Sequence, residues 1–310
     1  MELDIVIAFF MMGVIARLLR SNIQFPEALY QTLTLFLMIA IGLKGGIALA
    51  SHSSASLLPQ SLAVIVFGLM LPLLAFPVLF YIGHMNRADS ASIAAHYGSV
   101  SVGTYAVAVA LLESQNIAYE PYFPLFVVLL EMPAIAVGIA LANGKQKSID
   151  KRKLLHEVFC NQGMVLMVGA LIIGYWAGDR AESIAPLFKD LFHGALALFL
   201  LEMGMVAASR VSQLKEMGSF IIAFGVAMPL VGGIIGGLLG AGLGFSTGGT
   251  ILLSVLGASA SYIAVPAAMR VAVPEANPSL SITSSLGVTF PFNVLVGIPC
   301  YALYSQWLTN

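Results

Sequence analysis

Long apolar segments separated by short polar connections run along almost the whole chain. A helix needs roughly 20 apolar residues to cross about 30 Å of hydrocarbon. Ten segments come close to this length: 3–20, 27–50, 59–82, 90–112, 121–143, 158–177, 187–209, 217–241, 248–271 and 281–305. The pattern predicts an all-α integral membrane protein with ten transmembrane helices.

The two halves of the chain carry a weak internal repeat at an offset of about 159 residues. Three matches fall in order on the second, fourth and fifth segments of each half: Gly45 with Gly204, Gly98 with Gly257, and Pro133 with Pro291, one residue out of step. Because five is odd, two five-segment repeats have opposite orientations. The sequence therefore predicts two inverted repeats, residues 1–149 and 150–310, an arrangement typical of secondary transporters.

Composition supports the membrane assignment and limits the classes of partner that we expect. Hydrophobic residues make up 59% of the 310 residues and charged residues 9%, against about 25% charged in ordinary globular domains. A net charge of -1 gives no electrostatic reason to expect nucleic acid. Cys160 and Cys300 lie far apart without metal or redox spacing, and no cofactor is expected. Acidic residues precede the first segment and basic residues follow it, so we expect a retained helix rather than a signal peptide.

Basic residues predict the orientation. Of the 14 lysines and arginines, 11 lie at odd-numbered connections: Arg17, Arg20, Arg87, Lys145, Lys147, Lys151, Arg152, Lys153, Arg210, Lys215 and Arg270. This side should be cytoplasmic. Both termini then lie on the non-cytoplasmic side of the inner membrane, together with Lys44, Arg180, Lys189 and acidic residues such as Glu113. The basic cluster 145–153 indicates a cytoplasmic anchor, with a regulatory docking site as the alternative.

The fourth and ninth segments contain runs of small and hydroxyl residues near their middles. We expect both helices to break there, at 98–104 and 257–263, and to cross near the midplane. Unwound backbone is tolerated in a membrane where protein encloses it, and a half-helix N-terminus binds anions. Close packing through small residues is the alternative. The candidate substrate-binding residues are Gly98, Ser99, Ser101, Gly103, Thr104, Gly257, Ser259, Ser261 and Tyr262.

Ionisable residues inside the segments are candidates for ion binding or pairing. Glu131 stands beside Pro133, where we expect a helix break, and it corresponds roughly to Thr289. With Asn293, these residues form the candidate ion site; a structural role for Glu131 is the alternative. Lys44 and Glu202 lie one step apart under the repeat, which predicts a static ion pair. His96 is expected to be a hydrogen-bonded helix residue rather than a proton relay.

The chain resembles the SbtA-type sodium-dependent bicarbonate transporters of cyanobacteria over nearly all ten segments. The residues that carry the resemblance are IGLKGGIAL (41–49), the run at 98–104, ALLESQNIAYE (110–120), EMPA (131–134), MGM (203–205) and SASYIAVPAAMRVAVPEANPS (259–279). The resemblance implies a core of segments 3–5 and 8–10 that moves against a gate of segments 1, 2, 6 and 7. It also implies a homotrimer and an anion site between the two breaks.

Three departures from the family pattern limit what the resemblance implies. Cyanobacterial members have an aspartate where this chain has Tyr262, which puts sodium coupling in question. The connection linked to a PII-like regulator is shortened to 144–157. The family lysine aligns near Ala40 and the family acid near Val206, so Lys44 and Glu202 are each displaced by four residues on the same helix face.

These observations predict a secondary transporter of a small anion, with sodium-coupled bicarbonate uptake by alternating access first. A sodium-independent or proton-coupled carrier of another small anion is the alternative. A channel and an intramembrane serine protease are more distant alternatives. The protease chemistry needs a base within reach of the serine, and the ninth and tenth segments contain no histidine, so only His96 or His193 could supply one.

Overall fold

The computed structural model describes residues 5–51, 56–143, 156, 160, 162–210, 213–214 and 217–309. The basic cluster 145–153 and nearly all of the 144–157 connection lie outside the described residues. The helices of the first half are α1 (Ile5–Leu18), α2 (Glu27–Ser51), α3 (Leu57–Pro77), the π-helix η1 (Val78–Ile82), α4 (Arg87–Gly98), α5 (Val102–Ser114) and α6 (Pro124–Asn143).

The helices of the second half are more fragmented. They are α8 (Gln162–Ala177), the 3-10 helix η2 (Gly178–Ser183), α9 (Ala185–Asp190), α10 (Phe192–Ser209), α12 (Ser219–Gly242), α13 (Thr247–Ala258), α14 (Ala264–Ala272), α15 (Pro278–Ile282), the π-helix η3 (Thr283–Thr289), α16 (Phe290–Phe292), the π-helix η4 (Asn293–Gly297) and α17 (Ile298–Thr309). The described part of the chain contains no β-strand.

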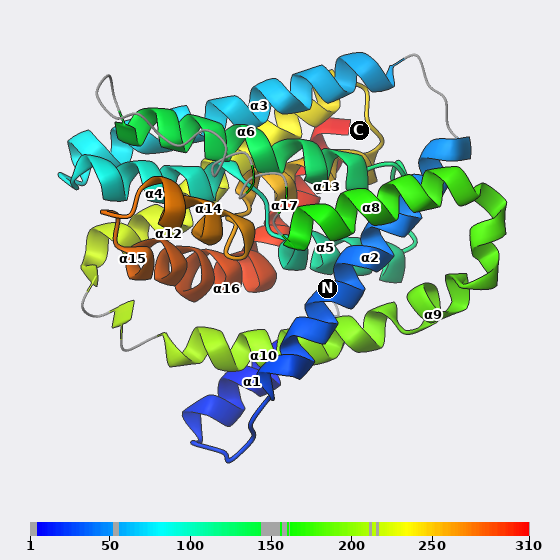
Figure 1. Cartoon of the computed structure of the whole chain (residues 1–310), viewed down its shortest axis with the longest axis horizontal. Helices are drawn as coiled ribbons and strands as arrows, with labels where there is room; N and C mark the ends of the chain where they lie inside the picture. Colours follow the sequence, from blue (N-terminus) through cyan, green and yellow to red (C-terminus); the bar gives the residue numbers. More distant parts are fainter. Residues whose placement is uncertain are drawn as a thin grey trace.

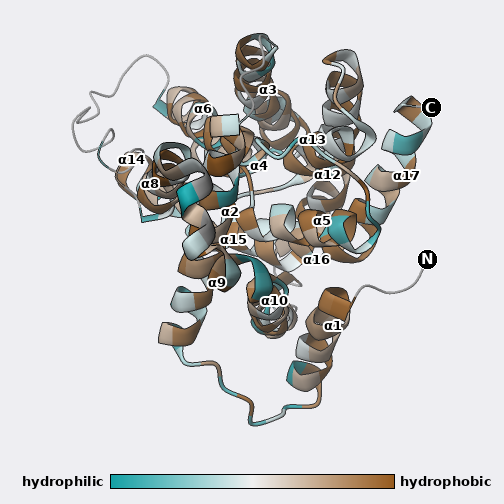
Figure 2. Ribbon diagram, turned by 90° about the vertical axis from the view of Figure 1, so that its right-hand side faces the viewer, coloured by the Kyte–Doolittle hydropathy of each residue, from teal (hydrophilic) through white to brown (hydrophobic). Residues whose placement is uncertain are grey.

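Seven helical stretches among the described residues are long and apolar enough to cross a membrane. Three shorter apolar helices, α1, α8 and α13, lie in the other predicted segments. Hydrophobic residues lie along most of the helices (Figure 2), and several large apolar side chains are exposed: Leu58 is 69% exposed, Trp176 71% and Trp307 76%. Such a surface is a liability in water but suits a lipid environment. The prediction of an all-helical fold is confirmed, and seven of the ten predicted segments are helices long and apolar enough to cross a membrane.

Two pairs of helices pack closely through glycine in the same way. In the first pair, Gly46 of α2 lies directly against the backbone of Leu171 in α8. In the second, Gly204 of α10 lies directly against the backbone of Phe10 in α1, and Figure 1 shows these two helices together along the lower edge. A side chain at either glycine would push the backbones apart, which is the usual reason for glycine between membrane helices.

The remaining helices form two bundles around the discontinuous segments. Helices α3, α4 and α6 pack together in the first half, and α12, α13 and α17 pack together in the second. Gly98 lies against Pro72 and Ala134, and Gly257 lies against Gly232 and Phe67. Two of the three glycines predicted to bind substrate, Gly98 and Gly257, therefore make helix-packing contacts at the ends of α4 and α13.

The two proline positions of the repeat differ. Helix α6 continues without interruption through Pro133, so the break expected beside Glu131 is wrong. A proline removes one backbone donor from a helix, and α6 accommodates that loss. Around Pro291, by contrast, three residues of α-helix lie between the π-helices η3 and η4. Gly45, which the repeat matches to Gly204, lies against Pro124, and its neighbour Gly46 makes the close helix contact instead. The two halves thus have corresponding glycine contacts, one residue out of step in α2, but not the same proline geometry.

Candidate functional site

The first break separates α4 from α5. Ser99 and Ser101 both adopt extended backbone conformations after Gly98 ends α4. Ser101 begins α5 as its N-cap, because its Oγ accepts a hydrogen bond from the Thr104 amide at 3.1 Å. The Thr104 hydroxyl donates to the same oxygen at 2.9 Å. A serine N-cap is a common way to begin a helix, and the predicted break is confirmed within residues 98–104.

The second break separates α13 from α14. Ser259 leaves the helix with an extended backbone, and its hydroxyl donates to the Leu256 carbonyl at 2.9 Å. Residues 259–263 separate the two helices, and Ser261 Oγ accepts from the Val265 amide at 3.5 Å. This second predicted break is also confirmed, and it is longer than the first.

The two breaks lie directly against each other. The Ser101 amide donates to Ser259 Oγ at 3.2 Å. The Ser261 amide donates to the His96 carbonyl at 2.8 Å, and His96 Nδ1 donates to the Ser261 carbonyl at 2.6 Å. Since a carbonyl oxygen can only accept, Nδ1 carries the proton. His96 is therefore the hydrogen-bonded helix residue that we expected, and it joins two segments far apart in the sequence.

Two buried hydroxyl groups at the breaks make no hydrogen bond of good geometry within the described structure: Ser99 Oγ and Tyr262 OH, the second of which faces the Ser101 side chain. The Tyr262 hydroxyl lies beside Gly103, where an added Cβ would come within 2.5 Å of it and 2.9 Å of the Phe199 ring. The Tyr262 ring packs edge-on against Phe290, with centroids 5.6 Å apart. Buried polar groups are nearly always hydrogen-bonded, so an unsatisfied hydroxyl at each of the two breaks indicates a position for a ligand.

The donors at this position suit an anion. The first amides of a helix have no partner within it, and the helix dipole favours negative charge at that end. Ser101 satisfies the Thr104 amide, and the earlier residue Gly103 in the first turn of α5 lies beside the Tyr262 hydroxyl. The arrangement can hold a small anion with neutral donors and without a basic side chain.

Asn293 and Thr289 have partners of their own in this structure. Asn293 Nδ2 donates to the Ala258 carbonyl at 2.7 Å and so satisfies the last turn of α13. Thr289 Oγ1 donates to the Gly225 carbonyl at 2.7 Å and accepts from the Tyr97 hydroxyl at 2.7 Å. Neither residue is hydrogen-bonded to Glu131 within the described structure, so the three are not assembled into one ion site.

Glu131 is a buried acid at the level of the first break. Helices α4 and α6 run antiparallel, because Gly138 lies against Ala95 while Ala134 lies against Gly98. Glu131, one turn before Ala134 on the same helix face, is therefore level with residues 99–101. Its side chain is 5% exposed, and its carboxyl has no hydrogen-bond or ion-pair partner within the described chain. An isolated buried carboxyl is costly, which makes Glu131 a candidate for a cation or a proton.

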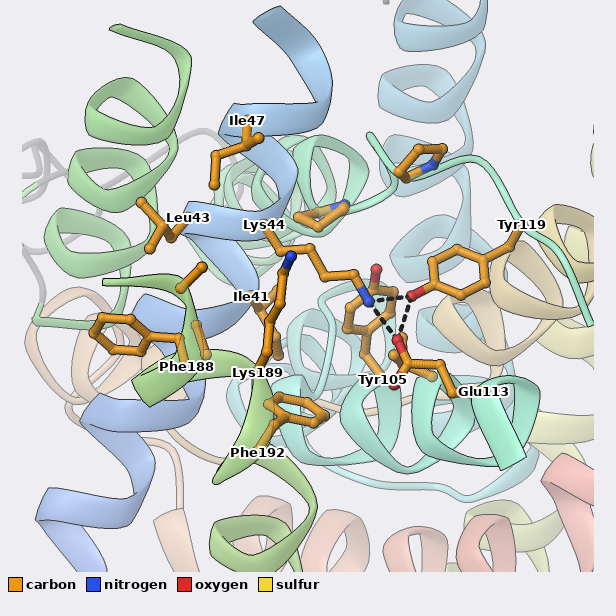
Figure 3. Close-up of a pocket in the computed structure, with 15 residues that line it drawn as sticks. Ile41, Leu43, Lys44, Ile47, Tyr105, Glu113, Tyr119, Phe188, Lys189 and Phe192 are labelled. Carbon is orange, nitrogen blue, oxygen red and sulfur yellow. Dashed lines mark hydrogen bonds and ion pairs between the residues drawn. The ribbon is translucent and has the colours of Figure 1, made fainter. Parts of the chain in front are cut away.

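The structure pairs Lys44 with a different acid from the one predicted. Lys44 Nζ contacts Glu113 Oε1 and donates to the Tyr119 hydroxyl at 2.7 Å (Figure 3). Tyr119 donates to the same carboxylate oxygen at 3.0 Å. Burial raises the pKa of the Tyr119 hydroxyl, while Lys44 opposes the shift, so this group stays protonated and can donate.

The predicted pair of Lys44 with Glu202 is therefore wrong. Glu202 lies on α10 with its Oε2 buried and without a hydrogen-bond partner in the described residues. The offset of the repeat matches Lys44 to Glu202, but it carries no information on which helices face each other. The shared non-cytoplasmic side of Lys44 and Glu113 was the sequence signal that could have found the observed pair.

The protease alternative has no support in the geometry. His96 bonds to the carbonyl of Ser261 and not to a serine hydroxyl. Ser259 Oγ bonds to backbone groups of Leu256 and Ser101. Nucleophilic catalysis needs a serine hydroxyl and a base within hydrogen-bond reach, and the described residues at the breaks contain no such pair.

Comparison with known proteins agrees with this geometry. The model of the Na+-dependent bicarbonate transporter superfamily matches residues 5–306, which is nearly the whole chain. A search of curated proteins finds no match. The match covers both breaks and every helix described above except the last three residues of α17. The chain belongs to the Na+-dependent bicarbonate transporter superfamily, and is therefore a multi-pass membrane transporter and not an enzyme.

Proposed function

We propose that the protein takes up bicarbonate together with sodium by alternating access, and that the anion binds where the two breaks meet. The single observation that carries this proposal is the contact between the breaks, with a buried, unsatisfied hydroxyl at each of them: Ser99 at the first, and Tyr262, beside Gly103, at the second. Family membership supports bicarbonate and sodium as the transported ions. Neutral donors suit a transporter, because a site that binds too tightly releases its ion slowly.

The packing pattern supports a division into core and gate within two inverted five-helix repeats. The glycine contacts join α2 to α8 and α1 to α10, that is, segments two and six and segments one and seven. An inverted repeat that exchanges segment one with six and two with seven maps each contact onto the other. The helices with breaks lie in the other two bundles, which supports a core that moves as a unit.

Glu131 is the acid that we propose for cation coupling. It is buried level with the first break, and it has no partner among the described residues. Sodium in a protein needs several oxygen ligands, and an anionic one strengthens the site. Because Tyr262 stands where cyanobacterial relatives have an aspartate, we expect weaker sodium dependence here than in those relatives. The hydroxyls of Thr104 and Ser261 are nearby candidates for further ligands.

The test is uptake of radiolabelled bicarbonate into proteoliposomes at a series of sodium concentrations. We expect an inward sodium gradient to stimulate uptake by the wild-type protein. Glu131→Gln removes the charge at nearly constant shape, so it should remove most of this stimulation, while Tyr262→Asp should increase it. Uptake driven by pH alone would favour proton coupling. An unchanged sodium response in Glu131→Gln would exclude this residue from the coupling site.

A further inference from the structure

A cavity of about 260 Å³ lies beside the Lys44–Glu113 contact, and we call it the vestibule. Its lining comes from α2, α5, α9, the connection before α6 and the start of α10. Along α5, it extends from Glu113 in the last turn to Tyr105 in the first. Tyr105 lies one turn from the break at residues 99–101. The vestibule is smaller than the roughly 300–1,000 Å³ of pockets that hold drug-sized ligands, so it suits a small ion with water.

Two lysines line the vestibule from different helices. Lys44 comes from α2 and Lys189 from α9, and Figure 3 shows the Lys189 ammonium group pointing into the space beside Lys44. Lys44 is paired with Glu113, whereas Lys189 has no ion pair within the described structure. His193 Nε2 approaches the second carboxylate oxygen of Glu113 at 3.6 Å. The lining itself has two positive charges, on Lys44 and Lys189, and one negative charge, on Glu113.

The rest of the lining strengthens the electric field of these charges. Apolar side chains, including Ile41, Val109 and Phe188, form most of the walls. Low-dielectric walls focus the field of charges that line a cleft, and so raise the local concentration of ions of opposite sign. The net positive lining therefore attracts anions. Lys44, Lys189 and Glu113 lie on the side that the charge distribution assigns to the exterior, so the vestibule faces the source of the substrate.

Glu113 itself indicates the chemistry of the ligand. Its carboxylate forms an ion pair with Lys44 and accepts a hydrogen bond from the Tyr119 hydroxyl. A small planar oxyanion presents the same kind of acceptor oxygens, so it can bind Lys189 directly and compete with Glu113 for Lys44. Lys44 and Lys189 both have mobile, hydrated ammonium groups, which can exchange one oxygen ligand for another.

We propose that the vestibule is a second, external binding site for a small monovalent oxyanion, held by Lys189 and Lys44 before it moves along α5 to the breaks. This inference rests on the proposed function, since it assigns the transported anion to the vestibule. The vestibule would bind the anion with basic side chains, whereas the site at the breaks would bind it with neutral donors. Lys189 acts here as a substrate-binding residue on the gate side of the path.

The test measures the concentration dependence of bicarbonate uptake in proteoliposomes that contain equal amounts of folded protein. Lys189→Gln should raise KM roughly fivefold, the scale of one partly exposed charge, and should leave the maximal rate within about twofold. Lys189→Arg keeps the charge and should keep KM near the wild-type value. Arg180→Gln is the matched control: Arg180 lies in the same connection, but its guanidinium packs over Trp176 at 4.4 Å and does not line the vestibule.

Each result has a distinct meaning. A raised KM in Lys189→Gln alone, with Arg180→Gln and Lys189→Arg unchanged, supports the vestibule site. Equal effects of Lys189→Gln and Arg180→Gln would show that Lys189 contributes only to the surface potential. That result would overturn the proposal. An unchanged KM in Lys189→Gln, or a loss confined to the maximal rate, would also overturn it. Failure of the proposed function itself is seen separately, as absence of bicarbonate uptake by the wild-type protein.

Discussion

Two places in the molecule have hydrogen-bond donors that suit an anion: the contact between the two breaks, and the vestibule. The donors differ in their chemistry. At the breaks, the groups are neutral: backbone amides at the start of α5 and the buried hydroxyls of Ser99 and Tyr262. In the vestibule, they are the ammonium groups of Lys44 and Lys189. The two breaks are joined by the hydrogen bond from the Ser101 amide to Ser259 Oγ, whereas the Lys44 side chain is 44% exposed.

This difference follows from the cost of burying charge. An unpaired ammonium at the breaks would lose its hydration, and the cost would be large. Fixed dipoles avoid this cost because they are already oriented before the anion arrives. In the vestibule, solvent reduces the cost, so charge can attract the anion over a distance. We therefore expect substitutions at the breaks to abolish transport, and substitutions in the vestibule to alter affinity or stability modestly.

The largest effect is expected from Gly103→Leu. Even the first carbon of the new side chain would lie 2.5 Å from the Tyr262 hydroxyl, so leucine fills the space proposed for the anion. Overpacking costs about 1–3 kcal/mol, which a folded protein can tolerate. Bicarbonate uptake should fall by at least about tenfold, while yield and gel-filtration profile remain normal. Gly169→Leu is the matched control, because Gly169 has open space around it. Normal uptake by Gly103→Leu would rule out the anion position at the breaks.

A smaller effect is expected from Ser259→Ala, which tests the bond between the two breaks. The substitution removes the acceptor of the Ser101 amide, and leaving a buried donor unsatisfied costs about 1–3 kcal/mol. Both Tm and uptake should decrease. In the control Ser209→Ala, the lost hydroxyl also donates to a carbonyl three residues earlier, but it joins no second segment. Similar losses of uptake in the two variants would show that the crossing bond has no special role.

The smallest effect is expected for the ion pair beside the vestibule. A double-mutant cycle of Lys44→Met and Glu113→Gln should give a coupling energy of about 0.2–1 kcal/mol, because both side chains are partly exposed, at 44% and 30%. The measurement is thermal unfolding in detergent. Lys44→Met combined with Glu202→Gln should be additive. Coupling to Glu202 with none to Glu113 would restore the pair predicted from the repeat and contradict the structure.

Sequence reasoning located the breaks because their signal is local. Glycine, serine and threonine in the middle of an apolar segment lower helix stability wherever the segment lies, and the extended residues Ser99 and Ser259 fall inside the predicted runs. The same reasoning predicted correctly that His96 is a hydrogen-bonded residue. The prediction of a break failed at Pro133, because α6 continues through this proline. Whether a proline breaks a helix depends on packing that the local sequence does not contain.

The sequence by itself determined the family, the helical membrane architecture and the positions of the two breaks, because hydrophobic length and small-residue runs act within single segments. Tertiary structure alone decided which groups meet. It placed Ser101 against Ser259, gave Lys44 the partner Glu113 in place of Glu202, and assigned Gly98 and Gly257 to helix packing. The physical reason is that an ion pair or a buried hydrogen bond depends on how helices distant in the chain face each other, and neither hydropathy nor repeat offset encodes that rotation.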